Sequence, residues 1–96
     1  MKAKKASDAV FLEQIPNIGK SIADDLRLID IQKPEQLKGA DGLELYHKLC
    51  KITGLRHDPC VADVFMAAVD FMNGGPSKPW WKFTPKRKRL LNPEQT

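Results

Sequence analysis

Residues 11–26 read FLEQIPNIGKSIADDL, and the organisation of much of the chain can be inferred from this stretch. An apolar run with helical spacing ends at Ile15 and Pro16, and a second such run begins near Gly19 or Lys20. Because proline disfavours helix in the residue before it, the residues between the two runs are expected to form a tight turn. Such a turn can hold a phosphate group through its backbone, or it can serve only to connect two packed helices.

Helical patterns on either side of this turn predict an all-α domain. Ser7 can cap a first helix that ends at the turn, and the second helix places Ile22 and Leu26 on one face. No segment alternates apolar and polar residues for long enough to form a strand. Four long helices and one short helix, the third, are expected at 7–15, 20–29, 34–39, 41–53 and 59–73. Asp41 and Asp58 are expected to cap the last two of them.

Charge divides the 96 residues into three parts, in a chain whose length suits a single domain. Residues 1–6 form a basic N-terminal segment with three lysines, and residues 7–75 form the expected helical domain, which is acidic. Residues 76–96 form an aromatic and basic tail with six Lys or Arg residues against one Glu. Long-range attraction to a polyanion must therefore come from the two ends, because the middle repels one.

The sequence predicts a cytoplasmic protein that makes no contact with a membrane. The basic opening residues are followed by no sustained apolar stretch, so they do not resemble a signal peptide, and no later segment could span a bilayer. Cys50 and Cys60 are too few for the disulfide framework of a secreted domain, and they are expected to remain thiols.

The segment LEQIPNIGKSIADDL resembles the helix-hairpin-helix motif of DNA-repair and recombination proteins. In that motif the backbone amides of the hairpin and of the following helix N-terminus hold a DNA phosphate without reading base sequence. Unpaired amides at the positive end of a helix dipole form an anion site on physical grounds as well. The resemblance implies DNA-binding positions at Asn17, Ile18, Gly19, Lys20 and Ser21. Asn17 stands where the motif has its first glycine, and asparagine tolerates a left-handed conformation.

A second helix pair repeats the pattern of the first. Residues 15, 17 and 18 recur 37 positions later, and residues 22 and 26 recur 39 positions later, as Ile52, Gly54, Leu55, Val61 and Phe65. The repeat predicts two helix-hairpin-helix units packed pseudo-symmetrically, in a tandem, SAM-like bundle of about five helices. The second hairpin is expected to be structural or to bind weakly, because Asp58 would repel a phosphate.

Four motifs between residues 11 and 83 carry a narrower resemblance: IPNIGKSIADDL, LYHKLC, RHDPCVADVF and the PWW that follows the last expected helix. Together they are similar to the small bacterial proteins of the pathogenicity-locus family, which are often labelled mitomycin-resistance proteins. The resemblance implies a helix-hairpin-helix fold, and it supplies no reaction.

The ligand types of a zinc site occur in an H-x2-C-x6-H-x2-C pattern formed by His47, Cys50, His57 and Cys60. Core packing is the better explanation, because Cys50 lies in an apolar stripe and Cys60 in the first turn of a well-patterned helix, so no metal or other cofactor is expected. No nucleophile, base and orienting group can be assembled, and Asp63 and Asp70 are assigned to the solvated face of the last expected helix. The protein is therefore expected not to be an enzyme.

The tail combines aromatic and basic side chains, at Trp80, Trp81, Phe83, Lys86, Arg87, Lys88 and Arg89. Aromatic rings beside cations suit nucleic acid through stacking and charge attraction. A tryptophan pair after the last helix can instead fold back over a small core. We expect Trp80 and Trp81 to cover the core and the basic run 86–89 to be a flexible DNA contact.

The expected function is sequence-independent DNA binding by a non-catalytic helix-hairpin-helix protein, in DNA repair or damage resistance. The contacts would come from the hairpin amides, Lys20 and the basic ends. The alternative is a protein-interaction or scaffold module that keeps the hairpin for packing and offers its acidic middle to a basic partner. A hairpin and tail that converge on one face would favour DNA binding, and their separation would favour the alternative.

Overall fold

The computed structural model describes residues 2–91, and its regular structure is entirely helical. The α-helices are α1 Lys20–Leu28, α2 Gly42–Thr53, α3 Cys60–Met72 and α4 Thr84–Leu91. Short 3-10 helices accompany them at Ala6–Asp8, Leu12–Gln14, Pro34–Leu37 and Trp80–Phe83. No strand occurs within the described range, so the all-α prediction is confirmed.

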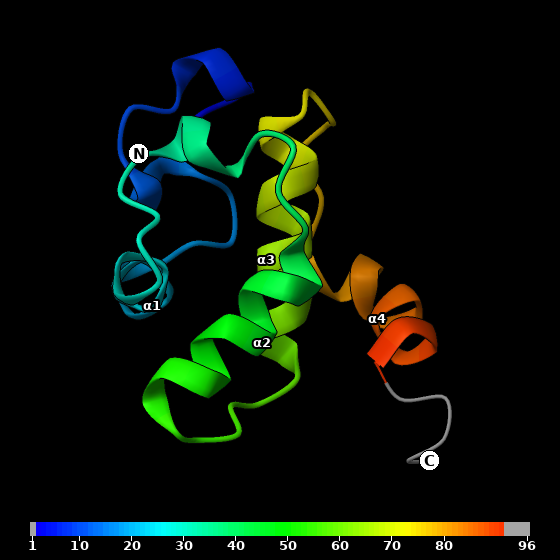
Figure 1. Ribbon diagram of the computed structural model, residues 1–96. Helices are drawn as coiled ribbons and strands as arrows, with labels where there is room; N and C mark the ends of the chain where they lie inside the picture. Colours follow the sequence, from blue (N-terminus) through cyan, green and yellow to red (C-terminus); the bar gives the residue numbers. More distant parts are fainter. Residues whose placement is uncertain (1, 92–96) are drawn as a thin grey trace.

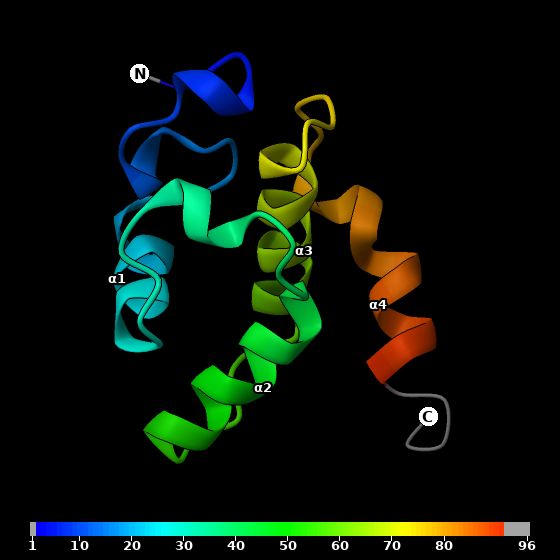
Figure 2. The ribbon, with the colours of Figure 1, turned by 45° about the horizontal axis from the view of Figure 1, so that its top comes forward.

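Helix α3 runs through the middle of the molecule, with α1 on one side of it and α4 on the other (Figures 1 and 2). Ten of its 13 residues are buried, which is the pattern of a helix covered on nearly all sides. Helices α2 and α4 pack against α3, whereas α1 packs mainly against α2 and the 3-10 helix Leu12–Gln14.

Between residues 2 and 91, no helix has the length and apolar character needed to cross a bilayer.

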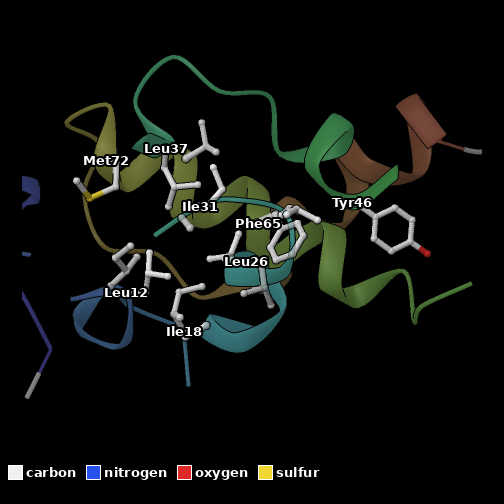
Figure 3. Packing of buried hydrophobic residues seen from close by; sticks show 14 of the residues in the cluster. Leu12, Ile18, Leu26, Ile31, Leu37, Tyr46, Phe65 and Met72 are labelled. Atoms are coloured by element: carbon white, nitrogen blue, oxygen red, sulfur yellow. The ribbon is translucent and has the colours of Figure 1, made fainter. Parts of the chain in front are cut away.

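The core joins α1 and the connector that follows it to α3. Figure 3 shows Leu26 of α1 beside Phe65 of α3, and Ile31 and Leu37 of the connector close by. All four side chains are buried. Burying a large aliphatic or aromatic side chain contributes roughly 1.5 to 3 kcal/mol, so these four side chains stabilise the packing between α1, the connector and Phe65 of α3.

Local signals placed several helix boundaries correctly. Helix α1 begins at Lys20, and the short helix begins at Pro34. Asp41 caps α2, because its carboxylate accepts hydrogen bonds from the amides of Leu43 and Glu44 at 2.9 and 3.3 Å. The predicted caps and prolines act within a few residues, so the sequence signal and the structure agree there.

The predicted helix over residues 7–15 was wrong. The chain instead forms the two 3-10 helices Ala6–Asp8 and Leu12–Gln14, separated by extended residues. Leu12, Ile15 and Ile18 are fully buried, and their spacing of three residues matches the three residues per turn of tight 3-10 structure better than the 3.6 of an α-helix. Pro16 also disfavours helix at Ile15, so the segment turns rather than extending a helix.

The prediction of a flexible basic run was wrong, and so was the assignment of Asp63 to a solvated face. Asp63 of α3 is 0% exposed, and its carboxylate accepts hydrogen bonds from Thr84 Oγ1 at 2.6 Å and from Arg87 Nε at 2.9 Å. A buried carboxylate is stable only with such partners. Residues 84–91 are therefore folded as α4 and bound to α3 by this contact.

The two tryptophans of the 3-10 helix Trp80–Phe83 have different environments. Trp80 is partly buried and packs against the core, whereas Trp81 is 57% exposed. The rings meet edge to face, with centroids 5.7 Å apart. The prediction that both rings cover the core therefore holds for Trp80 and was wrong for Trp81.

We expect Trp80→Ala to lower the free energy of unfolding by about 2 to 3 kcal/mol, since the substitution removes a ring from the edge of the core. Trp81→Ala is the matched control, and its effect should stay within about 1 kcal/mol because most of that ring already contacts water. Urea denaturation followed by circular dichroism measures both changes. Equal destabilisation by the two substitutions would contradict the described packing.

Candidate nucleic-acid interface

The first hairpin is a tight turn whose tip is held by internal contacts. Asn17 adopts a left-handed conformation with φ of 73°, which asparagine tolerates better than most residues do. Its side-chain amide donates a hydrogen bond to the carbonyl of Lys78 at 2.8 Å. The side chain of Ile18 is buried, and its backbone amide donates to the carbonyl of Ile15 at 3.1 Å. Asn17 and Ile18 thus shape the turn.

The next three residues face solvent and form the open part of the hairpin. Gly19, Lys20 and Ser21 are exposed, and their backbone amides donate to no acceptor within residues 2–91. Gly19 is the N-cap of α1, and no side chain caps that helix. Free amides and the positive end of the helix dipole together attract an anion.

Lys2 bonds to the backbone of the hairpin, a role that the sequence did not reveal. Its ammonium group donates hydrogen bonds to the backbone carbonyls of Glu13 at 2.8 Å, Ile15 at 3.1 Å and Ile18. Partial burial lowers the pKa of Lys2 from its ordinary value, while the nearby Glu13 carboxylate opposes that change. No local pattern could have indicated this contact, because the bonded residues lie 11 to 16 positions away.

Carboxylates flank the open amides, and the nearest ones are paired. Lys20 Nζ lies 3.0 Å from Asp24 Oδ2, and the hydrogen bond from Lys20 lowers the pKa of the Asp24 carboxyl. Arg27 binds Glu13 at 2.9 Å and lowers the pKa of that carboxyl through its hydrogen bonds. The ion pair between Lys20 and Asp24 is exposed and therefore contributes little to stability. The Lys20 ammonium group can bind another anion with only a small loss of stability.

The second hairpin, between α2 and α3, is held in place by hydrogen bonds to residues of α2. The hydroxyl of Tyr46 donates a hydrogen bond to the carbonyl of His57, and the amide of His57 donates to Cys50 Sγ at 3.5 Å. The Nε2 atom of His57 lies 2.9 Å from Thr53 Oγ1. These contacts fix the conformation of the second hairpin, so its turn is explained by hydrogen bonds within the protein.

The N-terminus of α3 already holds a carboxylate from its own chain. Asp58 Oδ1 accepts a hydrogen bond from the amide of Cys60 at 2.8 Å, and this bond lowers the pKa of the Asp58 carboxyl. The amides of Val61 and Ala62 donate to the carbonyls of Asp58 and Pro59, both at 2.9 Å. The end of α3 therefore has no free amide in its first turn for an external anion, in contrast to the end of α1.

The two hairpins share some features of the predicted repeat and differ in others. Asn17 and Gly54, which are 37 positions apart, both adopt left-handed conformations, with φ of 73° and 70°. Leu26 and Phe65, at equivalent positions in α1 and α3, are both buried. By contrast, the second hairpin exposes its apolar residues, and Leu55 is 64% exposed where Ile18 is buried.

The predicted basic contacts on α4 do not act together with the hairpin as one cluster. Lys86, Lys88 and Arg89 are exposed, whereas Arg87 is occupied by Asp63, which raises the pKa of its guanidinium through a hydrogen bond. Helices α1 and α4 lie on opposite sides of α3 (Figures 1 and 2). The structure thus provides an open hairpin and a separate cationic helix.

The four His and Cys residues of the zinc-like pattern have other surroundings. His47 is exposed, Cys50 receives the amide of His57, and a hydrogen bond with Asp58 raises the pKa of the Cys60 thiol. Among the described residues, no three His, Cys, Asp or Glu side chains are placed where they could hold a metal ion.

The fold and the hairpin define a small all-helical domain with free amides at the start of α1, and sequence comparison gives its family. The chain belongs to the pathogenicity locus family, Cdd1, whose model matches residues 5–89. It is 43% identical over 86 residues to the mitomycin resistance protein McrB of Streptomyces lavendulae, across 90% of this chain and 82% of that protein. No solved structure matches the chain. The family resemblance seen in the sequence is thereby confirmed.

Proposed function

We propose that this protein is a non-catalytic, helix-hairpin-helix type DNA-binding protein that holds a backbone phosphate at the N-terminus of α1 without reading base sequence. In this proposal the two hairpins belong to tandem helix-hairpin-helix units, of which only the first binds phosphate. A role in DNA repair or damage resistance agrees with the name of the mitomycin resistance relative.

The observation that carries the proposal is a glycine that the fold does not require. Gly19 has φ of −95°, which any residue can adopt, and a Cβ atom at this position would meet nothing within 4 Å. A side chain there would obstruct only the approach of an external group to the free amides. The missing side chain is therefore explained by a ligand that comes close to the backbone, as phosphate does at helix N-termini.

The difference between the two helix ends supports the same assignment. Asp58 already supplies a negative group at the end of α3, whereas the end of α1 has no such group. A second anion at α3 would be repelled by the Asp58 carboxylate. The alternative function, a protein-interaction module, is favoured by one observation, the opposite placement of α1 and α4 around α3.

We expect Gly19→Val to weaken binding to duplex DNA by about tenfold or more for every sequence alike, which corresponds to losing one charge-assisted hydrogen bond. Its stability should change by no more than about 1 kcal/mol, since the added side chain meets open space. Lys20→Ala should reduce the slope of log affinity against log salt by about one unit. Fluorescence anisotropy with labelled duplexes at several salt concentrations measures both effects.

Lys33→Ala is the control for Lys20→Ala, because Lys33 is an exposed lysine in the connector after α1. Its effect on the salt slope should be smaller than that of Lys20→Ala. Parent-like binding by both hairpin variants would assign the hairpin a structural role only. A parent protein without measurable affinity at low salt would eliminate the DNA proposal and leave the interaction module in its place.

A further inference from the structure

We infer that Lys2 is a positioning residue of the phosphate site, because its ammonium group orients and polarises the peptide that carries the Gly19 amide. This inference rests on the proposed function of the first hairpin. It assigns to the start of the chain a specific role in binding, beyond the general attraction of a basic segment.

The ammonium group of Lys2 is saturated by the hairpin. It has three N–H donors, and three backbone carbonyls accept from it, those of Glu13, Ile15 and Ile18. Hydrogen bonds from a charged donor are about twice as strong as neutral ones. One side chain therefore fixes both arms of the turn relative to each other.

Only one of the three carbonyls belongs to a peptide unit whose N–H group is free. The Ile15 carbonyl belongs to the peptide of Pro16, which has no N–H, and the Glu13 carbonyl belongs to the peptide of Gln14, whose amide already donates to Phe11 at 3.0 Å. The Ile18 carbonyl belongs to the same planar peptide unit as the Gly19 amide. That amide donates to no acceptor within the described chain.

A cation bound at a carbonyl withdraws electron density from its peptide and makes the N–H of that peptide a stronger donor. The effect passes from Lys2 through Ile18 to Gly19, the first open amide of the site. The positive charge of the ammonium group, held at the Ile18 carbonyl, also attracts an anion that approaches the neighbouring Gly19 amide. Lys2 thus acts on the phosphate without touching it.

The test compares Lys2→Met with Lys4→Met, which removes the same charge from an exposed lysine two residues away. Lys2→Met should weaken duplex binding by about tenfold, and Lys4→Met by less than about threefold, since only Lys2 donates to the peptide that carries the Gly19 amide. In the free protein, the 1H and 15N resonances of the Gly19 amide should shift in Lys2→Met and stay in place in Lys4→Met. Lys2→Arg should restore most of the affinity.

Titration of the parent with inorganic phosphate and with duplex DNA separates the possible failures. If neither ligand shifts the Gly19 amide and the parent binds no duplex, this inference and the proposed function both fall. If the parent binds but Lys2→Met and Lys4→Met behave alike, only the role of Lys2 is overturned.

If Lys2→Met has a lower melting temperature than the parent, its loss of affinity could come from a damaged fold, and Lys2→Gln is then the variant to compare. Glutamine retains neutral donors for the carbonyls and removes the charge. Reduced affinity at parent-like stability supports the inference, and parent-like affinity overturns it.

Discussion

Arg87→Ala is expected to lower the free energy of unfolding by about 3 to 5 kcal/mol, the usual cost of removing one partner of a buried ion pair. Asp63 has no contact with water, and Arg87 Nε binds its Oδ1 atom at 2.9 Å. Without the guanidinium, the carboxylate keeps only the hydroxyl of Thr84. The loss should also detach α4 from α3, because the same contact joins the two helices.

Lys88→Ala provides the control, since it removes a neighbouring exposed charge of the same helix and should change stability by less than about 0.5 kcal/mol. Replacing the pair together, as Asp63→Leu with Arg87→Met, should recover most of the loss because no buried charge is left unpaired. Urea denaturation of the parent and the three variants measures these changes in the free energy of unfolding. An Arg87→Ala protein as stable as its Lys88→Ala counterpart would show that α4 is not held by this pair.

Gly42→Ala is expected to destabilise the fold by about 2 to 3 kcal/mol, although alanine is the better helix former. A Cβ atom at this position would lie 2.6 Å from the backbone nitrogen of Met66 and 2.7 Å from its Cα. Backbone atoms in the middle of α3 cannot rotate away as a side chain can. Helices α2 and α3 would therefore have to separate where they now touch.

Gly19→Ala is the matched substitution in open space, and it should leave stability within about 1 kcal/mol of the parent. Thermal unfolding of the two variants side by side gives the comparison. A Gly42→Ala protein with a parent-like melting temperature would mean that the two helices are not in backbone contact at this point.

The sequence predicts this structure well wherever the determining contacts are short. Helices α1, α2 and α3 begin directly after a glycine, an aspartate and a proline, respectively. Each of these residues acts within one turn of the helix, and the starts lie close to the predicted ones. The left-handed residue in the first hairpin was predicted on the same basis. The open amides of the candidate site also follow from local order, because a turn directly precedes a helix.

Apart from the helix expected at 7–15, whose failure has a local cause, the failures involve partners far apart in the chain. Asp63 was assigned to the surface because its two hydrogen-bond donors, Thr84 and Arg87, lie 21 and 24 positions later. The role of Lys2 depends on carbonyls up to 16 positions away, and the exposure of Trp81 depends on where the tail packs. A periodicity analysis cannot detect such pairs, since it compares only neighbouring residues.

The contact between Asp63 and Arg87 also has a consequence for the order in which the protein is made. Helix α3 leaves the ribosome before Thr84 and Arg87 do. Until α4 has been made, the Asp63 carboxylate of α3 therefore has no cation to pair with. Chains that stop before residue 87 keep that carboxylate without its cation and stay more open to proteases. Synthesis of residue 87 is therefore required before the Asp63 carboxylate gains its buried cation.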